Sequence, residues 1–169
     1  MDKEQGNADY MMFADIDYKH PEVCDDVMNW GTWIVNEIGL KGFRLDAVQH
    51  FSENFTSKWV SNLRKECGDD IFVVGEFWVG DVRRMTEWLE NMGKKFSLFD
   101  APLLYNFHKI SKTEKADLRK VFDNSLVQVE PVNAVVSSHI ESYLQVEKLC
   151  TYNEIRLAYK IMTHRKVKP

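Results

Sequence analysis

The sequence predicts an α/β fold in which helices cover a sheet of parallel strands. Helical periodicity alternates with short apolar runs, two of these runs (GFRLD and IFVVGE) end in a carboxylate, and a hydrophobic content of 44% is typical of a globular protein. Strands that alternate with helices form parallel sheets, because each helix returns the chain to the start of the next strand.

The first predicted helix covers residues 21–38, where apolar side chains recur every three or four positions and Gly39 follows as a stop signal. Residues 42–46 are predicted to form a short buried strand. A second helix is expected from residue 51 to about 68, and a second strand at 71–76. The second helix is indicated by large apolar side chains at intervals of four: Phe51, Phe55, Trp59 and Leu63.

Asp81 is expected to cap a third helix, because an aspartate at this position can accept a hydrogen bond from a free backbone N–H of the first turn. The helix is outlined by Val82, Met85, Leu89 and Met92. Residues 96–99 are predicted to form a third strand, residues 117–122 part of a helix, and residues 133–137 a fourth strand.

The charge and the apolar pattern exclude several classes of partner. A net charge of -4 and a pI near 5.7 give no attraction to nucleic acid or to an anionic membrane. Neither a signal-peptide core nor a run of ~18 apolar residues occurs, so the sequence predicts a soluble, cytoplasmic protein. Cys24, Cys67 and Cys150 match no metal or disulfide pattern, which favours free thiols. No specific protein partner is indicated.

Two carboxylates stand at the ends of the first two predicted strands. Asp46 and Glu76 are therefore expected at the edge of the sheet where parallel α/β proteins collect their reactive groups. Adjacent strands would bring them to the separation of about 5 to 5.5 Å that a retaining glycosidase needs. Arg44 would keep Asp46 ionised, while the apolar surroundings of Glu76 would raise its pKa. For either carboxylate alone, helix capping or a simple ion pair is the alternative.

These motifs resemble a known family. GFRLDAVQH and, about thirty residues later, VVGEFW closely resemble the second and third signature regions of the α-amylase family of glycoside hydrolases, whose members are (β/α)8 barrels. The resemblance also includes GNADYMMFADIDYKHPEV, WGTW and FSLFDAPLLYNFH, so that it extends from about residue 6 to 136. It is greatest to the liquefying bacterial type and its intracellular fungal relatives.

The resemblance implies the middle strands of a (β/α)8 TIM barrel. Residues 1–136 would be a fragment of the catalytic domain, and residues 137–169 a basic tail that does not match. The implied activity is hydrolysis of α-1,4-glucan (starch or glycogen) by a retaining mechanism, or glucosyl transfer through the same first step. The tail itself is either solvated or a helix that binds a partner.

The resemblance also assigns roles to residues. It makes Asp46 the nucleophile, Glu76 the general acid/base and Arg44 the residue that orients the nucleophile. Its implied substrate-binding residues are Gln49, His50 and Trp78. Gln49 stands where many relatives carry lysine.

A calcium site is predicted near the N-terminus. Asp9, Asp15 and Asp17 cluster within nine residues, and carboxylate oxygens suit Ca²⁺, although an acidic loop with this spacing is more often merely solvated. The resemblance assigns Asp9, Asp15 and the carbonyl of His50 to a structural calcium ion, and Asp17 is a further candidate.

The sequence departs from the family in three respects. Its 169 residues fall short of the ~250 of a closed barrel, and the first signature region has no counterpart. AVVSSHIES stands where the fourth region should provide a third carboxylate, and Glu141 is out of register. We therefore expect a truncated gene product or an incorrect gene model, with an inactive binding or assembly module as the alternative function. Alone, the chain is expected to expose helix faces around Trp30 and Trp59 and to be neither a stable monomer nor an active amylase.

Overall fold

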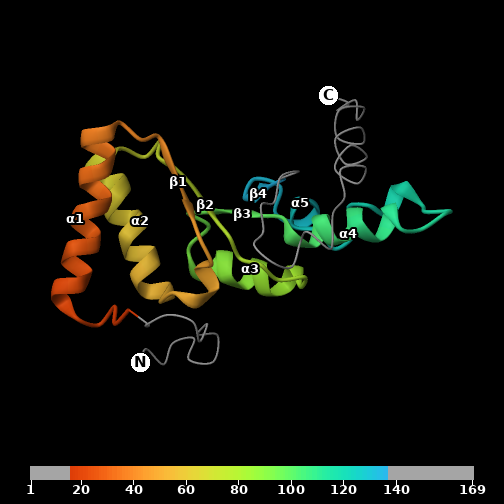
Figure 1. Ribbon diagram of the computed structural model, residues 1–169, viewed down its shortest axis with the longest axis horizontal. Coiled ribbons are helices and arrows are strands. Elements are labelled where there is room, and N and C mark those ends of the chain that lie inside the picture. The colour runs from red at the N-terminus through yellow and green to blue at the C-terminus, as the bar shows by residue number, and fades with distance from the viewer. Residues whose placement is uncertain (1–15, 137–169) are drawn as a thin grey trace.

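The computed structural model describes residues 16–136, which form an elongated α/β unit (Figure 1). Its four strands make one sheet in the order β1-β2-β3-β4, and every neighbouring pair is parallel. The strands follow one another in space as they do in sequence, which is the arrangement of consecutive units in a (β/α)8 barrel. Their bounds are Gly42–Leu45 (β1), Phe72–Gly75 (β2), Ser97–Phe99 (β3) and Ala134–Val135 (β4).

The first three predicted helices are confirmed. They are α1 (Pro21–Ile38), α2 (Glu53–Cys67) and α3 (Val82–Asn91). The helix α1 ends where Gly39 adopts a left-handed conformation with φ of 74°, which glycine adopts without steric cost. As expected, the side chain of Asp81 accepts a hydrogen bond from the backbone N–H of Arg83 at the start of α3.

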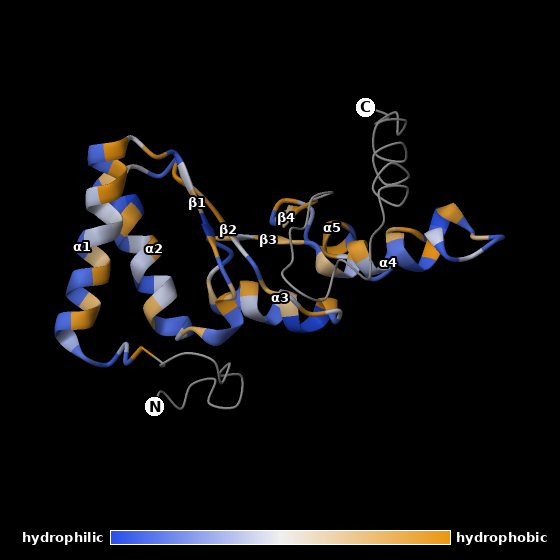
Figure 2. Ribbon diagram, in the orientation of Figure 1, coloured by the Kyte–Doolittle hydropathy of each residue, from blue (hydrophilic) through white to orange (hydrophobic). Residues whose placement is uncertain are grey.

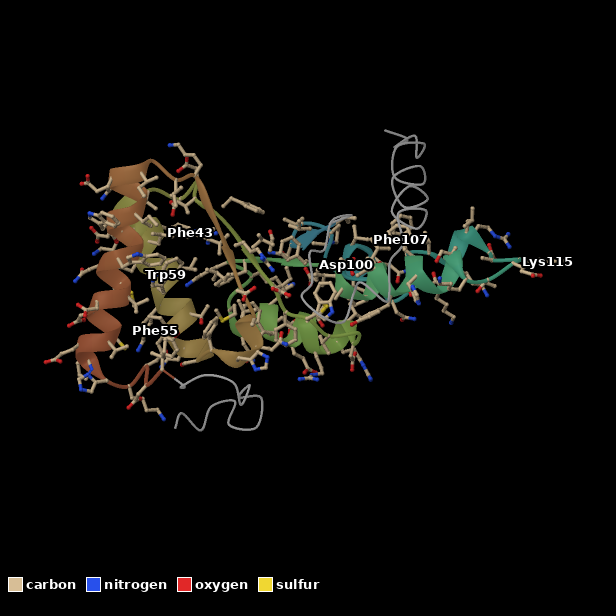
Figure 3. All side chains as sticks on the ribbon, viewed as in Figure 1. Phe43, Phe55, Trp59, Asp100, Phe107 and Lys115 are labelled. Atoms are coloured by element: carbon tan, nitrogen blue, oxygen red, sulfur yellow. The ribbon has the colours of Figure 1, made fainter. Side chains whose placement is uncertain are left out.

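The segment after β3 contains structure that the sequence analysis did not assign. Two further α-helices are α4 (Ala101–Ser111) and α5 (Leu126–Val129). The helix predicted at 117–122 is only a short 3-10 helix, η2 (Leu118–Lys120), which Asp117 caps. In Figure 3, α4 leads away from the sheet toward a tip at Lys115.

A buried carboxylate holds this segment together. Asp100 is 6% exposed; one of its oxygens accepts the N–H of Leu103 at the start of α4, and the other accepts the N–H of Val127 in α5. Its own N–H donates to the carbonyl of Val135 on β4. Asp100, which follows β3, therefore connects α4, α5 and β4, and its hydrogen bonds offset the cost of burying its charge.

The larger core cluster packs side chains of α1, α2 and α3 against the sheet. Phe43, Phe55 and Trp59 gather there (Figure 3), with the rings of Phe43 and Trp59 edge to face at 5.2 Å. The prediction that Trp59 is exposed is wrong: it is 4% exposed, and its indole N–H donates to the carbonyl of Val27. The ring fits only because Gly31 of α1 has no side chain, since a Cβ there would lie 2.7 Å from it.

The prediction for Trp30 is confirmed, because its side chain is 51% exposed. Hydrophobic residues recur along the whole of α1 (Figure 2), and Trp33 and Ile38 are also exposed. One edge of β1 pairs with no other strand of the described residues. Within residues 16–136, no helix has the length and apolar character needed to cross a membrane.

Candidate active site

Two neighbouring strand ends position the predicted catalytic carboxylates. Leu45 of β1 pairs with Gly75 of β2, so Asp46 and Glu76 leave the sheet side by side. The N–H of Glu76 donates to the carbonyl of Leu45 at 2.8 Å, and the N–H of Val48 donates to the carbonyl of Glu76 at 3.0 Å. These bonds fix the backbone of Glu76 on both sides.

The turn after Asp46 is locally strained. Ala47 has φ of 45° and ψ of 45°, a left-handed conformation that costs free energy for a residue with a Cβ. It leads directly into η1 (Val48–His50), whose first residue is buried in the core at 1% exposure. The packing of Val48 and its bond to Glu76 thus hold the turn in place.

Arg44 bridges the two carboxylates. Its Nη2 atom lies 2.6 Å from Oε2 of Glu76 and 3.2 Å from Oδ1 of Asp46. Because both oxygens contact one nitrogen, the distance between them cannot exceed about 5.8 Å, the sum of the two contacts. This limit is compatible with the separation of about 5 to 5.5 Å in retaining glycosidases. The shorter contact is with Glu76, whereas the sequence analysis expected Arg44 to pair with Asp46.

The environment makes the two carboxylates different. The side chain of Glu76 is 21% exposed and that of Asp46 is 78% exposed. Burial raises the pKa of Glu76, and a hydrogen bond with Asp46 raises it further, while the positive charge of Arg44 opposes both effects. The expected direction of the shift in Glu76 is therefore confirmed, and burial is its main cause.

The predicted substrate-binding residues Gln49 and Trp78 contact each other. Oε1 of Gln49 accepts the backbone N–H of Trp78 at 2.8 Å, which ties the segment after β2 to η1. The indole ring of Trp78 lies edge to face with Tyr105 of α4 at 6.4 Å. Tyr105 was not singled out from the sequence, because nothing local indicates that α4 returns to the end of β2.

His50 lies in the same turn and is partly buried. Its Nδ1 atom is enclosed and has no hydrogen-bond partner among the residues that the structure describes. A buried nitrogen without a partner costs free energy. A group that formed a hydrogen bond with this nitrogen would therefore stabilise the turn.

Only part of the predicted calcium site lies in the described residues. Asp17 is exposed and accepts the N–H of Lys19, whereas Asp9 and Asp15 are outside the described range. The ring of Tyr18 stacks on Phe55 at 4.4 Å and meets Phe51 edge to face at 6.1 Å, so the residue after Asp17 contacts the residue after His50. Within residues 16–136, no three metal-binding side chains cluster.

A third carboxylate is not supplied by β3. Asp100 follows this strand as Asp46 and Glu76 follow theirs, but both of its oxygens accept backbone N–H groups. Glu141, the residue singled out in the sequence, lies outside the described residues.

Comparison with known proteins gives a family. The model of the alpha amylase catalytic domain matches residues 7–155, a range that extends beyond residue 136. The chain is 43% identical over 136 residues to a glucan 1,4-alpha-maltohexaosidase of Bacillus sp. (strain 707) and 42% identical over 133 residues to an alpha-amylase of Bacillus licheniformis. These matches cover 80% and 78% of the chain. A cytoplasmic alpha-amylase of Escherichia coli (strain K12) is 32% identical over 148 residues, 86% of the chain.

Solved structures show the same fold. An alpha-amylase of Anoxybacillus superimposes with a TM-score of 0.62 over 72% of the chain, at 21% identity. The alpha-amylase of Geobacillus thermoleovorans, solved as a complex with acarbose, superimposes with a TM-score of 0.60 over 71%, at 22% identity. The chain spans 26% of each of these structures, and 26% to 30% of the three curated relatives.

Proposed function

This chain belongs to the alpha-amylase family through its catalytic domain, and we propose that it provides the two reacting carboxylates of a retaining glycoside hydrolase. The proposed substrates are α-1,4-glucans such as starch or glycogen. One observation carries the proposal. Arg44 joins an exposed carboxylate and a largely buried one at adjacent strand ends, which is the asymmetry that this chemistry requires.

In the first step, Asp46 acts as the nucleophile. Its ionised carboxylate attacks the anomeric carbon while the bond from that carbon to the leaving oxygen breaks. Glu76 donates its proton to the leaving oxygen, which the raised pKa of Glu76 favours. Arg44 holds the two carboxyl groups in place and stabilises the charge on Asp46.

In the second step, Glu76 acts as a base. It takes a proton from water, whose oxygen attacks the anomeric carbon and releases Asp46 as a carboxylate. The two inversions leave the sugar with its original configuration. When a sugar hydroxyl replaces water, the same step transfers the glucosyl group, and the described residues favour neither acceptor.

We further propose a calcium site beside this centre. Asp9, Asp15 and Asp17 would hold calcium together with the carbonyl of His50, because carboxylate and carbonyl oxygens are the ligands that it prefers. The contacts of Tyr18 with Phe51 and Phe55 support this grouping, because Tyr18 follows Asp17 in sequence and Phe51 follows His50. The ion would supply positive charge that ties the residues before α1 to η1.

Gln49, His50 and Trp78 would contact the glucan near the reacting bond. The bond from Gln49 to the N–H of Trp78 gives Gln49 a positioning role, so we assign the direct sugar contact to the ring of Trp78. His50 would reach the substrate from η1, and a group that pairs with its buried Nδ1 would fix its ring.

A second candidate function is glucan binding without catalysis. It is favoured by one observation: the stretch AVVSSHIES, which begins on β4, contains no carboxylate before Glu141. A third carboxylate stabilises positive charge on the sugar in the transition state of the family, so its loss would impair the chemistry more than the binding.

We also propose an intracellular location. Cys24 and Cys67 are free thiols, and the sulfhydryl of Cys24 donates to the carbonyl of Tyr18 at 2.7 Å. Free thiols suit a reducing compartment. The Escherichia coli relative is a cytoplasmic alpha-amylase, which agrees with this location.

The proposal is tested by grafting residues 16–136 into the alpha-amylase of Bacillus licheniformis, in place of the segment that they match. Proton NMR of maltooligosaccharide cleavage should show the α anomer as the first product, and an Asp46→Asn graft should be inactive. A β anomer, or turnover that persists in Asp46→Asn, would contradict the retaining assignment. If the graft of residues 16–136 turns over but a graft extended to residue 142 binds glucan without turnover, the second candidate function would be favoured.

A further inference from the structure

We propose that Phe99 is a positioning residue for Arg44: the aromatic ring holds the guanidinium beside the gap between Asp46 and Glu76. The contact stands on the geometry alone, and only its catalytic consequence rests on the proposed function. Phe99 is the last residue of β3 and is partly buried.

The sheet brings Phe99 and Arg44 together from strands that are not neighbours. Arg44 of β1 pairs with Val74 of β2, and Val74 pairs with Ser97 of β3. Phe99 stands two residues beyond Ser97, so its side chain emerges on the same face of the sheet. The Cζ atom of Arg44 lies 6.0 Å from the centre of the Phe99 ring, at the limit of a cation–π contact.

Arg44 needs such a support. Its side chain is 55% exposed, and an exposed ion pair does little by itself to hold a long side chain in one conformation. The salt bridges fix the Nη2 end of the guanidinium, while its Cζ atom lies over the ring of Phe99. Two different kinds of contact restrict the group more than either does alone.

The placement of Arg44 has a consequence for Glu76. Among the described residues, the charged groups that act on Glu76 are Arg44 and Asp46, and these oppose each other: Arg44 lowers the pKa of Glu76, and Asp46 raises it. If Arg44 moves away, burial and Asp46 dominate, and Glu76 holds its proton to higher pH. Through its contact with Arg44, Phe99 would thus influence the pKa of Glu76 without touching the substrate.

The experiment follows the carboxyl carbon of Glu76 by ¹³C NMR in the 169-residue chain as a function of pH. In Phe99→Leu, which keeps the apolar bulk and removes the ring, the titration midpoint of Glu76 should move to higher pH. The expected shift corresponds to a two- to fivefold change in the protonation equilibrium, which is the range of an exposed cation–π contact. Phe99→Tyr should restore the original midpoint. Phe72→Leu, at an exposed position of β2, is the matched control and should change nothing.

A second measurement needs no variant. In the unaltered chain, the side-chain N–H protons of Arg44 should be shifted upfield by the ring current of Phe99. An unshifted Arg44, or an unchanged Glu76 midpoint in a folded Phe99→Leu chain, would overturn the proposal. In the active graft, Phe99→Leu should lower kcat rather than raise KM and should move the alkaline limb of the pH profile upward. If the titration midpoint of Glu76 shifts in Phe99→Leu but the graft is inactive, the role of Phe99 would stand and the proposed function would be contradicted instead.

Discussion

Asp46 and Glu76 carry the same functional group but have opposite environments. Asp46 is open to water, while Glu76 is enclosed by β2 and by the turn that contains Ala47 and Val48. This contrast could be predicted from the sequence, because Glu76 ends an apolar run and Arg44 precedes Asp46 by two positions. The preference of Arg44 for Glu76 could not, since it depends on a side-chain conformation that the local sequence does not set.

The raised pKa of Glu76 predicts how stability depends on pH. The folded state holds this proton more tightly than the unfolded state, so the stabilisation is complete below the ordinary value of 4.5 and is lost as pH rises through the raised folded pKa. Glu76→Gln removes this titrating group, so the urea concentration at the midpoint of unfolding should depend less on pH above 4.5. Glu87→Gln, at an exposed position of α3, should retain the dependence of the original chain. Equal slopes for the two variants would mean that Glu76 is not the titrating group.

Gln49 provides a prediction about the loop after β2. Gln49→Lys removes the acceptor for the N–H of Trp78 and should cost about 1 kcal/mol, the usual net contribution of one hydrogen bond. Gln49→Glu keeps an acceptor and is the control. Hydrogen exchange of the Trp78 amide should accelerate in Gln49→Lys alone. Unchanged exchange would show that other contacts hold this loop.

At the scale of elements, the contact of α1 with α2 depends on one glycine and one tryptophan. Gly31 lies in the middle of α1, where alanine would normally stabilise a helix by about 0.5–1 kcal/mol. The ring of Trp59 occupies the space that a side chain would take, and its bond to Val27 prevents it from moving aside.

Gly31→Ala should therefore destabilise the chain. Overpacking of about 1–3 kcal/mol should outweigh the gain in helix propensity. In a Trp59→Phe background the same substitution should cost less, because the smaller ring leaves room. The free energy of unfolding of the four chains forms a double-mutant cycle. Additive costs, or a stabilised Gly31→Ala, would contradict the packing described here.

The elements that the sequence did not predict have a common physical origin. The helix α4 begins with an apolar run that has no clear helical periodicity, and it starts where Asp100 accepts the N–H of Leu103. The short helix α5 is held by the bond from Val127 to the same carboxylate, 27 residues away in sequence. Local patterns identified α1, α2 and α3, because apolar side chains recur at helical spacing along these segments and do not do so clearly at the start of α4.

At the scale of the whole molecule, one edge of β1 is not paired with any other described strand. An apolar cavity of about 230 Å³ opens there, between β1, α1 and α2, with Trp30, Phe43 and Trp59 in its lining. Trp30 and Trp33 add exposed aromatic surface on α1. In a closed barrel, neighbouring units share such surfaces, whereas an open edge and a large apolar patch favour association.

We expect the purified chain to self-associate through this face. Trp33→Gln should shift sedimentation velocity profiles toward the monomer without lowering the melting temperature, because Trp33 is 55% exposed and contributes little to the core. Lys58→Gln, at an exposed position of α2, is the control for a polar surface change. A wild-type chain that is monomeric at all concentrations would contradict this expectation.

The central claim is that Asp46 is the nucleophile and Glu76 the acid/base, and covalent trapping tests it most directly. A Glu76→Gln graft of residues 16–136 in the Bacillus licheniformis enzyme would be incubated with a fluorinated glucosyl fluoride, whose leaving group needs no proton. Mass spectrometry of its peptides should then locate the sugar on Asp46. A sugar bound to any other residue, or a graft that turns over good leaving groups without forming an adduct on Asp46, would contradict the assignment.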